Sequence, residues 1–183
     1  MDSALKAIPV SATVTQLAQI MTPLDVNFLG KVFGGSVLAL VDLCASATSQ
    51  KFSGMICVTA SFDQVDFHDP IEIGELLTLT GHVSYVGRTS MEVTIDVEST
   101  NLRTGIMRHT NTARVTMVAL QDGKPTPVPR LLCESREDKI SYLEGHFRRD
   151  QRKKRMQELE RAKLDLQSAS DSEIDRLMAE TLA

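Results

Sequence analysis

The feature that most constrains the fold is a single apolar helix-forming run with strand-forming segments on both sides of it. Residues 36–51 place apolar side chains at helical spacing, and their wide apolar face predicts one long buried helix. A looser alternation over 11–21 predicts a strand before that helix. Four alternating segments follow the helix, at 55–67, 75–86, 89–103 and 106–120. We therefore expect an α+β domain whose antiparallel sheet wraps around one long central helix.

Two positions predict irregularities in the strands. The alternation slips between Phe62 and Val65, which predicts a bulge, and Gly81 predicts either another bulge or a close approach to the helix. A single sheet with one helix also leaves its edges open and its helix partly uncovered. We therefore expect a partner sheet, with a homodimer as the minimal assembly.

The pattern changes near residue 130. Residues 124–130 form a proline-rich extended exit, and residues 131–183 are dense in alternating charge. We expect residues 1–130 to form the main domain and residues 131–183 to form a charged C-terminal helical extension. For the extension two interpretations stay open: a solvated helix that packs against a neighbour, or a basic site for an anionic ligand.

Composition narrows the class of protein. With 183 residues, 42% of them hydrophobic, the chain can bury one substantial core. Three cysteines without metal-ligand spacing favour a reducing cytoplasmic setting, in which Cys44 and Cys57 behave as small buried hydrophobic residues. A net charge of -4 and an aromatic content of 4% disfavour nucleic-acid binding. No apolar run reaches the roughly 20 residues that span a bilayer, so no membrane partner is expected.

Asp42 is the one acid inside the apolar helical run. Burial would desolvate an unpaired carboxylate there, which suits a general base or nucleophile. The alternative is an aspartate on the polar flank of the helix, solvated beside Ser46 and Ser49. Spacing alone leaves both interpretations open.

Gly34 and Gly35 open the same helix, where free backbone N–H groups and the positive end of the helix dipole point outward. These donors suit a carbonyl oxygen or an oxyanion, although two glycines can also simply form a turn. The helix rise places Gly35 about 10 Å from Asp42, too far for both to serve one carbonyl. Two chains with antiparallel helices would bring Gly35 and Asn27 of one subunit to Asp42 of the other.

Asn27 offers a neutral donor and acceptor that could orient water or a carbonyl, although an asparagine at such a position also suits a turn.

The sequence gives little support for serine-histidine, metal-dependent or nucleotide-dependent chemistry. The four histidines, His68, His82, His109 and His146, have no serine or cysteine partner in a recognisable elbow, and no GxSxG motif occurs. The chain also lacks HExxH, CxxC and Walker-type motifs, so we expect no metal and no nucleotide triphosphate.

Arg88 lies at the tip of a strand connection, flanked by Gly87, Thr89 and Ser90. A guanidinium, hydroxyls and backbone N–H groups can together surround a phosphate, although a solvated hairpin tip is the alternative. Lys124 and Arg130 frame the proline-rich segment and could add a second basic contact. We therefore assign a candidate phosphate-binding surface to this loop.

Several of these motifs occur together and in order, which allows a comparison with a known family. They are the pattern N-x-x-G-x-x-F-G-G-x-x-x-x-x-x-D from Asn27 to Asp42, Val65-Asp66-Phe67, Pro70, Gly74-Glu75, and residues 86–91 and 124–129. Over about residues 11–130 the chain resembles the hotdog-fold acyl-CoA thioesterases of the YciA and brain acyl-CoA hydrolase type. Phe33 stands where many members of that family have histidine.

The resemblance implies hydrolysis of acyl-CoA to free CoA and a fatty acid, with CoA as part of the substrate and no cofactor. It implies a hotdog dimer that commonly assembles into a hexamer, a trimer of dimers. By position, Asn27 and Asp42 look like the catalytic amide and acid, contributed by opposite subunits, with the Gly35 N–H polarising the thioester carbonyl. The loop around Arg88 would meet the CoA phosphates, and the acyl chain would run between the paired helices.

Two other functions are compatible with the same fold. A hotdog hydratase or dehydratase usually needs a catalytic histidine near the helix, and none lies between Asn27 and Asp42. A noncatalytic module that senses acyl-CoA is the other alternative, and the charged extension could serve it. The presence of both Asn27 and Asp42 favours the enzyme.

Overall fold

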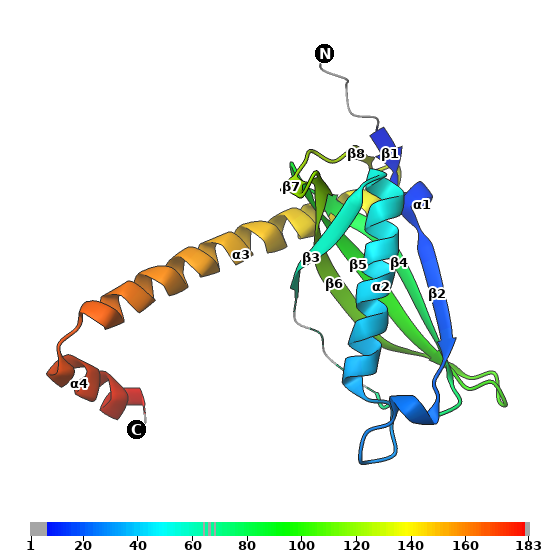
Figure 1. Ribbon diagram of the computed structural model, residues 1–183, viewed down its shortest axis with the longest axis horizontal. Helices are drawn as coiled ribbons and strands as arrows, with labels where there is room; N and C mark the ends of the chain where they lie inside the picture. The colour runs from blue at the N-terminus through cyan, green and yellow to red at the C-terminus, as the bar shows by residue number, and fades with distance from the viewer. Residues whose placement is uncertain (1–6, 64, 66, 68, 182–183) are drawn as a thin grey trace. The chain divides into compact units, whose positions relative to one another are not determined.

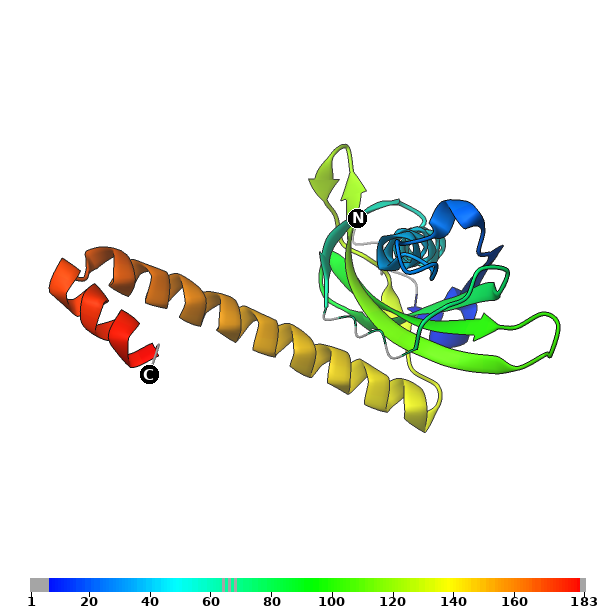
Figure 2. The same ribbon diagram turned by 90° about the horizontal axis from the view of Figure 1, so that it is seen from below.

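A curled antiparallel sheet around one helix dominates the computed structural model (Figure 1), which describes residues 7–63, 65, 67 and 69–181. The sheet is six-stranded, in the order β2-β4-β5-β6-β3, and β7 pairs with β6. Its strands are β2 Thr15–Ile20, β3 Ile56–Phe62, β4 Leu76–Val86, β5 Ser90–Thr100, β6 Met107–Gln121 and β7 Lys124–Pro125. Figure 2 shows the central helix end-on inside the curl of the sheet. The expected α+β architecture is confirmed.

The central helix, α2, spans Gly34–Ser53 and confirms the predicted helix, with two more residues at each end. One face is buried against the sheet, through Val37, Leu40, Val41, Cys44, Ala45, Thr48, Ser49 and Phe52. The helix ends at Gly54, whose left-handed backbone (φ 70°) suits glycine and whose N–H donates to the Gln50 carbonyl. Because α2 fills the concave side of the sheet, the sheet and α2 together form one core.

The chain divides into two compact units, Met1–Leu143 and Glu144–Ala183. Residues 131–143, which the sequence assigns to the extension, lie in the first unit. There β8 Arg130–Leu132 pairs in parallel with β1 Ala7–Pro9, and α3 Arg136–Ser168 begins. The second unit holds the rest of α3 and α4 Asp171–Thr181. Among the described residues, no helix combines the length and the apolar character needed to cross a membrane.

The N-terminal strand is shorter than the sequence predicts. Residues Val10–Thr13 form a short helix, α1, and the strand β2 covers only Thr15–Ile20. The Thr13 hydroxyl donates to the Val10 carbonyl (2.8 Å) and accepts from the Val83 N–H (3.0 Å). These bonds hold the buried Thr13 in a turn, which overrides the weak alternation around it.

The two predicted strand irregularities have different outcomes: the bulge lies at another position, and Gly81 marks a close approach. The strand expected at 55–67 ends at Phe62, and its register shift lies between Thr59 and Ser61 rather than after Phe62. The segment beyond it contains Asp66 and His68, which lie outside the described residues. At Gly81 the register is regular, and an added Cβ would lie 2.6 Å from the Thr48 hydroxyl oxygen. Gly81 therefore permits a close approach to α2, as one of the two interpretations expected.

The outer face of β5 is more buried than an alternating strand predicts. Glu92 and Thr94 are both buried, and Glu92 accepts a hydrogen bond from the Ser84 hydroxyl (3.0 Å). The first turns of α3 lie close to this side of the sheet, since the Tyr142 hydroxyl donates to the Val86 carbonyl (3.4 Å). The first turns of α3 therefore cover part of the outer face of the sheet, which the periodicity of the strands does not predict.

Candidate active site

Asp42 lies on the flank of α2 that faces β3. Its carboxylate is half-buried, and it accepts a hydrogen bond from the Thr59 hydroxyl at 2.5 Å. Thr59 comes from the neighbouring edge strand, β3. Asp42 is thus neither fully buried nor simply solvated. A hydroxyl from a different element binds one oxygen of the carboxylate, and no described residue forms a hydrogen bond to the other.

Sequence reasoning missed Thr59. On β3 the more buried positions are Cys57, Thr59 and Ser61, while the apolar Ile56 and Val58 are 69% and 43% exposed. A run of small polar residues on the inward side of an otherwise apolar strand was the available signal. Exposed apolar residues on an edge strand also indicate a surface that a partner can cover.

The loop that carries Asn27 is fixed at its beginning and at its end. It begins with a short 3-10 helix, η1 Pro23–Asp25, which Thr22 and Asp25 cap reciprocally. Hydrogen bonds from the Thr22 backbone and hydroxyl lower the pKa of Asp25. At the other end, the Phe33 N–H donates to the Asp25 carbonyl (2.6 Å). The loop therefore reaches α2 in a defined conformation.

The side-chain amide of Asn27 has only one orientation that suits this loop. Its Oδ1 accepts hydrogen bonds from the Leu29 N–H (2.9 Å) and the Lys31 N–H (3.2 Å). Within the described part of the chain, no group accepts from its Nδ2. Asn27 can therefore act toward a substrate as a hydrogen-bond donor, because its acceptor is already used.

Gly34 and Gly35 form the first turn of α2. The Ser36 and Val37 N–H groups bond to the Phe33 carbonyl, and no described residue accepts from the N–H of Gly34 or Gly35. The Phe33 ring packs directly on Gly35, so that an added Cβ would lie 2.2 Å from its Cε1. A Cβ on Gly34 would make only ordinary contact, 3.5 Å from the Phe67 ring. A Cβ at position 35 would therefore require the exposed Phe33 ring to move, and two N–H donors are left free of described partners.

One backbone hydrogen bond joins two of the segments that carry the predicted basic residues. The Arg88 carbonyl accepts from the Val128 N–H (3.0 Å), which joins the β4–β5 connection to the proline-rich segment. Lys124 lies on β7 and Arg130 on β8, and the side chains of both residues and of Arg88 are exposed. No acid in the described part of the chain pairs with any of these three basic groups.

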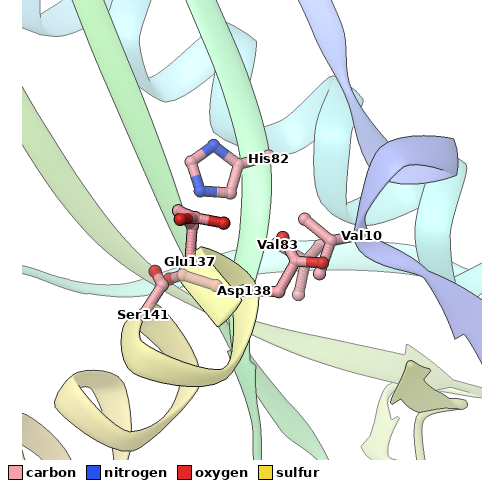
Figure 3. A pocket seen from close by; sticks show the side chains of 7 residues that line it. Val10, His82, Val83, Glu137, Asp138 and Ser141 are labelled. Atoms are coloured by element: carbon pink, nitrogen blue, oxygen red, sulfur yellow. The ribbon is translucent and has the colours of Figure 1, made fainter. Parts of the chain in front are cut away.

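A separate pocket lies on the outer side of the sheet. His82 on β4 and Glu137, Asp138 and Ser141 of α3 line this pocket (Figure 3), which has a volume of about 130 Å³. Burial lowers the pKa of His82, although the nearby Asp96 and Asp138 oppose this effect. Gly81 faces α2, so the neighbouring His82 points to the opposite side of the sheet. His82 therefore does not belong to the Asp42 site, and no described cluster of acids, histidines and cysteines could hold a metal.

Comparisons with known proteins agree with this geometry. Residues 29–106 match the family model described as Thioesterase superfamily. The uncharacterized acyl-CoA thioester hydrolase YkhA of Bacillus subtilis is 37% identical over 134 residues, which cover 73% of this chain and 78% of that protein. The cytosolic acyl coenzyme A thioester hydrolase of Rattus norvegicus is 32% identical over 81% of this chain and 40% of its own length.

Two solved structures extend the likeness to three dimensions. A hexameric acyl-CoA thioesterase superposes with a TM-score of 0.79 and 41% identity, covering 83% of this chain and 98% of that one. The acyl-CoA hydrolase of Staphylococcus aureus, solved with butyryl coenzyme A, coenzyme A and coenzyme A disulfide, gives a TM-score of 0.78 and 32% identity over 88% and 99%.

Variants of the staphylococcal enzyme allow a comparison of spacing. Three of its structures each carry one alanine substitution, of an asparagine, an aspartate and a threonine in turn. In that sequence the aspartate follows the asparagine by 15 residues, and the threonine follows the aspartate by 17. Asn27, Asp42 and Thr59 show the same order and spacing here. With the curled sheet, the central helix and these matches, the chain belongs to the thioesterase superfamily, among the hotdog-fold acyl-CoA thioester hydrolases.

Proposed function

We propose that this protein hydrolyses acyl-CoA thioesters to free CoA and a carboxylic acid, with Asp42 as general base or nucleophile. The observation that carries the proposal is the hydrogen bond from Thr59 to Asp42, on the helix whose first turn presents free N–H groups. A carboxylate held by one hydroxyl has a defined direction of attack. Free N–H groups at a helix N-terminus stabilise the negative charge that develops on a thioester oxygen.

Two subunits would build each site. Asp42 and Gly35 are separated by about 10 Å of helix, whereas one carbonyl must lie about 3 Å from both the attacking group and its donors. We propose that Asn27 and Gly35 of one subunit meet Asp42 of the other, which gives two equivalent sites per dimer. The exposed apolar residues of the edge strand β3 support a partner on this side of the chain.

The roles of the two donors follow from their geometry. Because its Oδ1 is occupied by the loop, Asn27 would donate from Nδ2 to the thioester oxygen or to the attacking water. The Gly35 N–H would polarise the same carbonyl, and the Phe33 ring beside it would limit the access of water. Donors that are already oriented stabilise charge without first having to rearrange.

The CoA moiety would be bound through its phosphates. Residues 87–90 supply the Arg88 guanidinium, two hydroxyls and a glycine, and Lys124 and Arg130 add positive charge. Arginine binds phosphate through two parallel hydrogen bonds. CoA would be both a part of the substrate and a product, and we propose that the reaction needs no cofactor or metal.

We further propose a homodimer as the minimal assembly and a hexamer, a trimer of dimers, as the complete one. The hexameric thioesterase that this chain resembles over 98% of its length supports this assembly. By analogy with the cytosolic rat relative, we propose a cytoplasmic location.

The test is a steady-state assay that follows released thiol with a panel of acyl-CoAs. Asp42→Ala should abolish thiol release, while calorimetry should show unchanged CoA binding and light scattering an unchanged oligomer. Undiminished turnover of Asp42→Ala would overturn the assignment of Asp42. Binding of acyl-CoA without thiol release by the native protein would instead identify a sensing module, and a modified acyl chain on intact CoA would identify a hydratase.

A further inference from the structure

A turn at residues 70–75 holds the end of the loop that carries Asn27. The Val32 N–H donates to the Ile71 carbonyl (3.0 Å), and both residues are buried in the core. Val32 also pairs with Val26 in an isolated antiparallel bridge, and Val26 directly precedes Asn27 in the sequence. The hydrogen bond to Ile71 therefore holds both arms of the loop around the amide.

The same turn also binds the residue at which the chain enters the loop. The Met21 N–H donates to the Glu75 carbonyl (2.9 Å), and the Gly74 N–H donates to the Met21 carbonyl (2.8 Å). The turn leads directly into β4, which belongs to the sheet. The hydrogen bonds inside the loop fix its shape, whereas the bonds to the turn fix its position relative to the sheet.

A partly exposed ion pair adds a further contact between the turn and the loop. Lys31 Nζ lies 2.5 Å from Glu72 Oε1. The Lys31 N–H is one of the two donors to Asn27 Oδ1 (3.2 Å), and the Lys31 carbonyl accepts from the Asn27 N–H (2.8 Å). Lys31 thus connects the turn to the amide itself.

A polar cluster at the end of the sheet holds the turn in place. Glu75 is buried, and both of its carboxylate oxygens accept from Arg108 Nη2 at 2.9 Å. The Ser99 hydroxyl and the Glu72 N–H (3.2 Å) donate to the same carboxylate. Arg108 Nη1 donates to the Pro70 carbonyl (3.5 Å). Because Ser99 on β5 and Arg108 on β6 are paired in register, two strands of the sheet fix both ends of the turn.

We infer that Glu75 and Arg108 are positioning residues for the Asn27 donor, and that they act through the turn at residues 70–75. The inference rests on the proposed function, in which Asn27 Nδ2 donates to the thioester oxygen or to the attacking water. Groups of an active site must be held within about 0.5 Å of their productive geometry, and a misplacement of about 1 Å can lower a rate about a hundredfold. Residues that fix the turn therefore influence kcat from outside the site.

A purely structural role for the cluster is the alternative. Loss of a buried charge partner lowers the free energy of unfolding, but it does not by itself change the kcat of the molecules that remain folded. Positioning predicts in addition that the effect on kcat depends on the presence of the Asn27 amide. A double-mutant cycle measures this dependence.

The first test combines Arg108→Met with Asn27→Ala and follows released thiol under saturating acyl-CoA. Arg108→Met alone should lower kcat by about tenfold and change KM by less than about twofold. In the Asn27→Ala background the same substitution should lower kcat by less than about twofold, because the donor that it positions is absent. Arg114→Met is the matched control on β6 and should keep the native kcat, since the Arg114 guanidinium has no described partner.

The outcomes separate this inference from the proposed function. Equal losses of kcat from Arg108→Met in the two backgrounds would overturn the positioning role and leave Asn27 as the donor. A native kcat for Asn27→Ala would overturn the proposed role of Asn27 and this inference with it.

The second test leaves the buried cluster intact, so that it remains decisive if Arg108→Met unfolds. Lys31→Glu breaks the ion pair with Glu72 and should lower kcat by about threefold. Adding Glu72→Lys should restore kcat to nearly the native value, because the pair forms again with reversed charges. In the Asn27→Ala background neither substitution should change kcat. Circular dichroism verifies folding, and a kcat that Lys31→Glu leaves unchanged or that Glu72→Lys fails to restore would contradict positioning through the turn.

Discussion

Thr59 donates a 2.5 Å hydrogen bond to Asp42 across the boundary between β3 and α2. The bond joins the edge strand to the acid of the candidate site. Thr59→Val keeps the shape of the side chain but removes the hydroxyl. We expect kcat to fall by about tenfold to a hundredfold, since a hydrogen bond to a charged group is worth about 1.5–3 kcal/mol. Thiol release under saturating acyl-CoA measures the effect.

Thr78→Val, at a half-exposed position of β4, is the matched control for this change and should keep full activity. Equal kcat values for Thr59→Val and the native enzyme would show that the hydroxyl does not hold Asp42 for the reaction.

Gly34 and Gly35 are adjacent but differ in the space around them. Gly35→Ala would place a Cβ 2.2 Å from the Phe33 ring, whereas Gly34→Ala would make ordinary contact with Phe67 at 3.5 Å. We expect Gly35→Ala to lower kcat/KM by about tenfold through displacement of the Phe33 ring beside the helix start, and Gly34→Ala to have a smaller effect. Adding Phe33→Ala to Gly35→Ala should recover part of the loss. If both alanine variants were equally active, steric fit at position 35 would not matter for the site.

Arg88 is exposed and forms no ion pair in the described part of the chain. Arg88→Ala should raise KM for acyl-CoA by about tenfold and leave kcat nearly unchanged, because phosphate binding stabilises the ground state and the transition state equally. The same variant should show a weaker dependence of KM on ionic strength. Arg103→Ala, on the exposed β5–β6 connection, removes the same charge elsewhere and should leave KM unaltered.

Glu75 links the acid stability of the fold to a partly buried ion pair with Arg108. It is 4% exposed, and both of its carboxylate oxygens accept from Arg108 Nη2 at 2.9 Å. Burial alone raises the pKa of Glu75, but hydrogen bonds from Ser99 and the Glu72 N–H, together with Arg108, bring its net pKa below the ordinary value. The ionised form is therefore favoured by folding.

A lowered pKa means that this stabilisation is complete above the unfolded-state pKa of Glu75 and is lost as the pH falls through the lower folded-state value. The free energy of unfolding should thus decline from about pH 5 downward. Glu75→Gln should be less stable by about 1.5–3 kcal/mol at pH 7 and show a flatter decline in acid, as measured by urea unfolding at several pH values. Glu98→Gln, on β5, is the control, and an identical pH dependence for all three proteins would refute the role of Glu75.

The sequence predicts the elements that local periodicity determines, but not the contacts between residues far apart along the chain. The helix over α2 and the strands β5 and β6 follow from local periodicity, since one face of each is buried by the same core. The turn at Thr13 depends on Val83, 70 residues away, and Thr59 lies 17 residues from Asp42 on a different element, so helical or strand periodicity reveals neither contact. The residue types at Asn27 and Asp42 are evident from the sequence, but the direction in which the Asn27 amide points is decided by the loop that closes around it.

The anchored amide of Asn27 also bears on the thermodynamics of substrate capture. A freely rotating side chain loses about 0.5–1.5 kcal/mol of entropy when a ligand immobilises it. Here that loss occurs during folding, when Leu29 and Lys31 fix the amide plane. Substrate binding then involves no further loss of entropy at this donor, so the affinity for substrate is higher than it would be with a freely rotating amide.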